Sequence, residues 1–173
     1  MKETIQDLTT RRSVKRYQPT QINRADLEKI LKAGMNAPSG MGRQSAVMVV
    51  VQEPETVKKL SRMNAEVMGG HADPFYGAPT VIIVFADKEV PTYKEDGSLV
   101  MGNLLNAAHA LGLGSCWIHR AKEVFNSAEG KALMKKWGLK DSLEGIGHCI
   151  LGYGEGPEPA EKPRKDGYVV WAD

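Results

Sequence analysis

The chain has 173 residues and a net charge of +2, with 42% hydrophobic and 25% charged residues. These values are ordinary for a soluble globular protein, and the charge is too small to indicate that the molecule as a whole binds nucleic acid. The length suits one domain with a sizeable core, so we expect residues 1–173 to form a single domain.

The apolar stretches are all short. None approaches the length of a membrane span, and Met1 opens no signal-like sequence. We therefore expect a cytoplasmic protein with no membrane partner. Cys116 and Cys149 lie within apolar runs, which predicts two reduced and buried thiols.

Hydrophobic spacing and turn residues predict an alternation of helices and strands. Asn23, Pro54 and Ser98 are suited to begin helices. The expected helices are residues 3–9, 24–35, 54–68, 98–111 and 128–137. The expected strands are residues 46–51, 80–86, 115–118 and 145–153, with 168–171 as a candidate fifth. This alternation predicts a sheet with helices on both faces, but it does not determine the strand order.

The same spacing predicts which side chains are buried. In the helix of residues 24–35 the buried face consists of Leu27, Ile30, Leu31, Gly34 and Met35. In the helix that follows Pro54 it consists of Val57, Leu60, Asn64 and Val67. The expected strands 46–51 and 80–86 are apolar and are predicted to be buried.

A basic segment, residues 11–17, follows the first expected helix and has the sequence RRSVKRY. If it is extended, Arg11, Ser13 and Lys15 share one face, while Arg12, Val14 and Arg16 share the other. Two cations around a hydroxyl are suited to binding an anion such as phosphate. A solvated basic surface and a contact with nucleic acid are the alternatives.

A second basic cluster, Lys162-Pro163-Arg164-Lys165, lies near the other end of the chain. By itself such a cluster is typical of a solvated tail. Two clusters far apart in sequence can also converge on one phosphate group, which favours a small phosphorylated cofactor over a long nucleic acid.

The turn Pro38-Ser39-Gly40, with Gln44 four residues further on, is either a simple helix-to-strand loop or a ligand-binding loop with free N–H groups. We expect no zinc site, because His148 and its neighbour Cys149 point to opposite faces of a strand. The glycines of residues 152–156 precede no helix, which excludes a dinucleotide-binding fingerprint.

Five pieces of the sequence occur in the order and spacing of a known family. They are RRSVKRY, APSGMGRQ, YGAPTVIIVF, NLLNAAHALGLGSCWI and GIGHCILGYGEGPEPAEKPRK. Over essentially its whole length the chain resembles the FMN-dependent nitroreductase family. The resemblance implies a single FMN-binding domain with an α+β, three-layer fold, in which helices flank a central, mostly antiparallel sheet. It also implies a homodimer in which the C-terminal segment is exchanged between subunits.

The resemblance further implies an FMN site without a metal. Arg11, Arg12 and Ser13 correspond to positions near the phosphate and ribityl chain. Lys15 corresponds to a cation beside N1 and the C2 carbonyl of the flavin, and it is the expected catalytic residue. A loop of the other subunit that covers the flavin corresponds to Pro38, Ser39 and Gly40, and a glutamine near the flavin corresponds to Gln44. A strand end whose backbone approaches N5 corresponds to Ile118 and His119. A terminal basic pair on the phosphate corresponds to Lys162 and Arg164.

The implied activity is an FMN-dependent oxidoreductase. Hydride from NADH or NADPH would pass through flavin N5 to a small-molecule acceptor such as a nitroaromatic, a quinone or an activated alkene, by a ping-pong mechanism. His119 and Arg120 stand where some branches of the family have Glu-Gly, so the resemblance is to the family and not to one activity. Two alternatives stay open: a flavin-binding protein for storage or redox sensing, and a nucleic-acid-binding module that uses residues 11–16.

Overall fold

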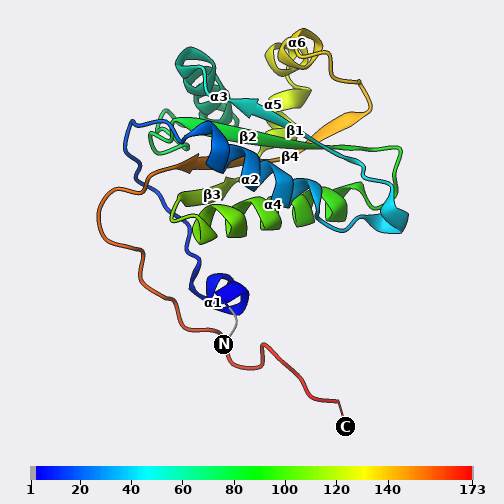
Figure 1. Cartoon of the computed structure of the whole chain (residues 1–173). Helices are drawn as coiled ribbons and strands as arrows, with labels where there is room; N and C mark the ends of the chain where they lie inside the picture. The colour runs from blue at the N-terminus through cyan, green and yellow to red at the C-terminus, as the bar shows by residue number, and fades with distance from the viewer. Residues whose placement is uncertain (1–2, 173) are drawn as a thin grey trace.

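The computed structural model describes residues 3–172. Its centre is a four-stranded sheet in the order β1-β2-β4-β3, in which all neighbouring strands are antiparallel (Figure 1). The strands are β1 (Ala46–Val51), β2 (Thr80–Asp87), β3 (Gly114–Ile118) and β4 (Leu143–Gly152). The helices are α1 (Glu3–Thr10), α2 (Arg24–Met35), α3 (Pro54–Val67), α4 (Tyr93–Ala110), α5 (Ala121–Asn126), α6 (Ala128–Lys136) and the short 3-10 helix η1 (Gly40–Gly42).

Helices cover both faces of the sheet. Figure 1 shows α2 and α4 on one face and α3, α5 and α6 on the other. Alternate residues of β2 point to the two sides, so that Ile83 and Phe85 join the core under α3 and α5, while Ile82 and Val84 join the core under α2 and α4. The predicted α+β, three-layer fold with an antiparallel central sheet is therefore confirmed.

Four apolar residues predicted to be buried are exposed. β1 is an edge strand whose one neighbour is β2, and its Val47 and Val50 side chains are 37% and 36% exposed. The prediction of a fully buried strand was wrong because an edge strand is only partly covered. Met35 and Val67 occupy the last turns of α2 and α3 and are likewise exposed.

The start of α4 was also predicted wrongly. The helix begins at Tyr93, and Ser98 lies inside it, donating a hydrogen bond from Oγ to the carbonyl of Lys94 (2.7 Å). Gly97 also lies inside the helix, and its position requires a glycine, because a Cβ there would lie 2.6 Å from Cγ1 of Ile146 on β4. A glycine inside the helix thus permits close packing of α4 against β4.

Two further differences lie beyond β3. The short helix α5 was not predicted, although its Ala121 is fully buried. Residues 168–171, the candidate fifth strand, belong to no strand in the described chain. Their side chains are 67–86% exposed, and the C-terminal end of the chain extends away from the sheet and its covering helices (Figure 1).

Cys116 and Cys149 are unpaired and buried, as predicted. They belong to the cores on opposite faces of the sheet. Burial raises the pKa of the Cys149 thiol well above its ordinary value. Within residues 3–172, no helix is both long enough and apolar enough to cross a membrane.

Candidate functional site

The basic segment, residues 11–17, is extended and lies beside β3, at the edge of the sheet. Ser13 pairs with Ser115 in the parallel direction, and the Val14 amide donates to the Ser115 carbonyl (3.0 Å). The segment then pairs with the chain that follows β4, where Tyr17 lies opposite Gly154. The segment therefore meets the condition for an alternation of its side chains between two faces.

The predicted alternation of faces holds only in part. Ser13 and Lys15 are exposed, and Val14 packs against the core on the α3 side of the sheet. Arg16, predicted to share a face with Val14, is exposed and lies 3.6 Å from the Glu155 carboxylate. The alternation ends there because the segment leaves β3 and joins the chain after β4.

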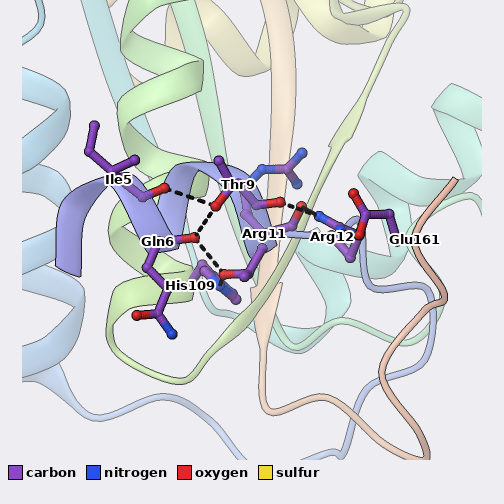
Figure 2. Close-up of polar contacts among 8 residues, drawn as sticks. Ile5, Gln6, Thr9, Arg11, Arg12, His109 and Glu161 are labelled. Carbon is purple, nitrogen blue, oxygen red and sulfur yellow. Dashed lines mark hydrogen bonds and ion pairs between the residues drawn. The ribbon is translucent and has the colours of Figure 1, made fainter. Parts of the chain in front are cut away.

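Arg11 carries a donor nitrogen without a partner. Among the described residues, its Nη1 atom is buried and makes no hydrogen bond. Arg12 differs, because its Nη1 donates to the Thr9 carbonyl (2.8 Å) and its Nη2 lies 3.3 Å from a Glu161 oxygen. Figure 2 shows the two guanidinium groups pointing to different sides, with Arg12 turned towards Glu161. An anionic oxygen, such as one of a phosphate, would satisfy the buried Arg11 N–H group.

The ion pair between Arg12 and Glu161 also places the second basic cluster. Lys162 directly follows Glu161, and Arg164 is two residues further along. Both side chains are exposed. Within one chain, the ion pair thus brings the residue that precedes the C-terminal cluster to the basic segment.

The turn at the end of β3 is held by an amide network. Ile118 is buried and His119 is exposed. The fully buried Asn64 of α3 donates from Nδ2 to the His119 carbonyl (2.7 Å). Arg120 donates from Nη2 to Asn64 Oδ1 (2.9 Å) and adopts a left-handed backbone with φ +74°. A non-glycine residue in this conformation persists where surrounding contacts determine it.

The loop of residues 38–44 lies elsewhere in the chain. It is joined to the start of α4, where the Gly40 amide donates to Asp96 Oδ1 (2.9 Å). The basic segment lies near the end of α4, where Thr10 Oγ1 is 2.9 Å from His109 Nε2. Thirteen residues of helix between Asp96 and His109 correspond to about 20 Å. Within one chain, the structure does not bring Pro38, Ser39, Gly40 and Gln44 to the basic segment.

Three structurally important residues were not identified from the sequence as site residues: Asn64, Asp96 and Arg120. Asn64 and Asp96 gave a usable signal, because each is a polar residue on the apolar stripe of its helix. Asp96 precedes Val100 and Leu104 by four and eight residues, and all three are buried. Arg120 gave no such signal, since its backbone conformation follows from the tertiary contacts.

The sequence model of the nitroreductase family matches residues 8–72 and 63–154. The chain belongs to the nitroreductase family. A protein of Archaeoglobus fulgidus, provisionally named as an NADH dehydrogenase/NAD(P)H nitroreductase, is 35% identical over 159 residues, covering 88% of this chain and 86% of that protein.

Solved nitroreductase structures agree closely with this fold. A nitroreductase of Bacteroides fragilis with bound FMN is 27% identical and superposes with a TM-score of 0.92, covering 100% of both chains. An FMN-dependent nitroreductase of Clostridium difficile is 27% identical with a TM-score of 0.82, covering 98% of this chain and 99% of that one.

Proposed function

We propose that this nitroreductase-family chain binds FMN and passes a hydride from NADH or NADPH to a small-molecule acceptor by a ping-pong mechanism. Nitroaromatics, quinones and activated alkenes are the acceptor classes that suit this chemistry. The observation that carries the proposal is the buried, unpartnered Nη1 of Arg11, next to an extended basic segment. A terminal phosphate fits that donor, and the FMN bound in the Bacteroides fragilis structure has one.

The residues of the basic segment have separate roles in this proposal. Arg11 and Ser13 bind the phosphate and the adjoining chain of the cofactor, and Arg12 joins them when Glu161 releases it. Lys162 and Arg164 approach the same phosphate from the C-terminal segment. Each charge-assisted hydrogen bond to a phosphate is stronger than a neutral one, which favours retention of the cofactor.

When bound, FMN supplies a ring that accepts a hydride at N5 and gives it up again. Lys15 is exposed, and its Nζ lies 5.7 Å from the centre of the Tyr76 ring. We assign it the stabilisation of negative charge on the N1 and C2 side of the ring. The turn of Ile118 and His119 contributes backbone groups on the N5 side, and the Asn64 network keeps this turn in place.

We also propose a homodimer with the cofactor at the subunit interface. The loop of residues 38–44 and the basic segment lie at opposite ends of α4, so a second copy is required to bring them together. Gly102 on α4 has open space where a Cβ would be, which leaves room for close approach of another helix. The exposed residues 168–171 can pair with the free edge of β1 in the partner, where Val47 and Val50 are exposed.

The visible spectrum and the bound cofactor of the purified protein test this proposal. We expect a yellow protein that releases FMN on heat denaturation, identified by chromatography. Under anaerobic conditions, NADH or NADPH should bleach the flavin absorbance, and adding an acceptor should restore it. Released FAD, or a colourless protein that FMN does not reconstitute, would refute the proposal. FMN that neither nicotinamide reduces would favour a storage or sensing protein instead.

A further inference from the structure

Asp96 is a buried carboxylate in the first turn of α4, and it holds the loop that precedes β1. Its Oδ1 accepts from the Gly40 amide (2.9 Å). Its Oδ2 accepts from the Ser45 hydroxyl (2.6 Å) and, at 3.3 Å, from the Thr92 hydroxyl. The residue is 2% exposed, so these donors replace water around its charge. One carboxylate therefore joins both ends of the loop to the start of a helix.

The balance of forces on this carboxylate favours its ionised form. Burial raises the pKa of Asp96, but the hydrogen bonds from Ser45, Gly40 and Thr92 lower it further than burial raises it. The pKa consequently lies below the ordinary value for an aspartate.

The loop itself has an unfavourable backbone. Met41 and Gln44 both have positive φ, at +54° and +50°. Residues other than glycine adopt this region only where contacts compensate for the strain. One such contact is internal, since the Gln44 amide donates to Ser39 Oγ (3.0 Å). The Gly40 amide and the Ser45 hydroxyl both donate to Asp96, and these two contacts attach the loop to α4.

Gly40 lies against Thr92 so closely that a side chain would not fit. A Cβ at Gly40 would overlap the Thr92 hydroxyl and lie 2.9 Å from the Thr92 methyl group. The position therefore requires glycine for contact with α4, although its φ is not positive. Disturbing this contact displaces the loop without altering Asp96 itself.

We propose that Asp96 is a positioning residue for cofactor binding: its carboxylate holds the loop of residues 38–44 in the shape that covers the FMN bound by the partner subunit. This inference rests on the proposed function. Asp96 does not touch the cofactor and acts through Gly40 and Ser45. The strained loop therefore has its binding conformation before the cofactor binds, so that cofactor binding does not have to order the loop.

The first experiment compares Asp96→Ala with Glu95→Gln in the full-length chain. Glu95 is the exposed neighbour in the same helical turn, so its substitution removes a charge without affecting the loop. In Asp96→Ala, hydrogen exchange of cofactor-free protein should speed up at the Gly40 and Gln44 amides and stay unchanged in β2. The dissociation constant for FMN should rise at least tenfold, while Glu95→Gln behaves as the unmodified protein. Asp96→Asn should show an intermediate effect, because its amide oxygen still accepts from Gly40.

A second pair of variants disturbs the loop from the other side. Gly40→Ala should weaken FMN binding about as much as Asp96→Ala. Adding Thr92→Ala to it should restore part of the affinity, because it removes the overlapping hydroxyl and methyl group but also one donor to Asp96.

The outcomes separate this inference from the proposed function. Normal loop exchange and normal FMN affinity in Asp96→Ala would refute the role of Asp96. So would faster exchange throughout the sheet, because Asp96 would then support the fold as a whole. If the unmodified protein does not bind FMN, the proposed function is refuted. The hydrogen-exchange data would then still show whether Asp96 orders the loop of residues 38–44.

Discussion

At the scale of single residues, Lys15 and Arg16 are adjacent exposed cations with different surroundings. Arg16 pairs with Glu155, whereas the Lys15 Nζ lies 5.7 Å from the centre of the Tyr76 ring. A pairing at the surface contributes little to stability. The two residues therefore form a matched pair for testing the assigned role of Lys15.

Lys15→Ala should slow the reduction of bound flavin by about 100-fold, because one charge-assisted contact to a developing anion is lost. FMN affinity should change by less than about tenfold, since the phosphate contacts are retained. Stopped-flow reduction of saturated protein measures the rate, with Arg16→Ala as the control. An unchanged rate in Lys15→Ala would exclude the proposed role.

His148 is a second residue whose surroundings predict its behaviour. It is fully buried, with the Phe75 and Phe125 ring centres at 5.3 Å and 5.9 Å. Burial lowers its pKa from 6.5 to about 4, although the nearby backbone of Ile118 and His119 favours the charged form. Neither ring nitrogen makes a hydrogen bond of normal geometry with a described residue. The folded protein therefore holds His148 neutral.

This predicts a loss of stability in acid. The unfolded chain takes up a proton at His148 below about pH 6.5, whereas the folded chain does so only near pH 4. The contribution of neutral His148 is complete above pH 6.5 and is lost as the pH falls towards 4, with a magnitude on the order of 3 kcal/mol. Urea unfolding across this range should show a shallower loss in His148→Leu than in the control His71→Gln, whose histidine is exposed. Equal slopes in the two variants would contradict the prediction.

At the scale of elements, the candidate site depends on turns that distant elements hold. The turn after β3 is attached to α3 through Asn64, and the loop before β1 is attached to α4 through Asp96. Both anchors are buried side chains that bond to backbone groups of another element. Loops held in this way can present backbone groups to a ligand without reordering.

Asn64→Ala should lower the free energy of unfolding by about 1–3 kcal/mol, because the His119 carbonyl loses its donor and Arg120 loses its acceptor. FMN affinity should fall as well, since the turn beside the proposed N5 position is freed. Urea titration and fluorescence titration with FMN measure the two effects. The control Asn126→Ala removes an exposed amide that makes no side-chain hydrogen bond with the described residues, and it should cost within about 0.5 kcal/mol. Unchanged FMN affinity in Asn64→Ala would place the turn outside the site.

At the scale of the whole molecule, the described chain has surfaces that a second copy would complete. The C-terminal residues 168–171 carry large apolar side chains that are exposed in the single chain. The free edge of β1 carries unpaired backbone groups and two exposed valines. Exposed apolar side chains and unpaired strand edges are both features that association commonly buries.

Truncation after Gly167 should therefore lower both dimer stability and FMN occupancy. Sedimentation at micromolar concentration and the ratio of flavin to protein absorbance measure the two quantities. Trp171→Ser in the full-length chain separates the loss of apolar contact from the loss of chain length, and it should show a smaller effect in the same direction. A flavin-loaded monomer of the unmodified protein would defeat the prediction.

The sequence alone determined the family and the bounds of most helices and strands. These features depend on local spacing, on cap and turn residues such as Asn23 and Pro54, and on short motifs in a recognisable order. Asn23 caps α2 as predicted, with its side chain accepting from the Asp26 amide, and Pro54 is the first residue of α3.

Only the tertiary structure decided which atoms are left without partners and which segments are held together. The Asp96 carboxylate bonds to an amide 56 residues away, and Arg11 Nη1 is buried without a partner among the described residues. Ser98 was predicted to begin a helix, but α4 begins at Tyr93, and Gly97 inside it packs closely against Ile146. Local periodicity carries no information about such contacts, because each is set by how whole elements pack across the sheet.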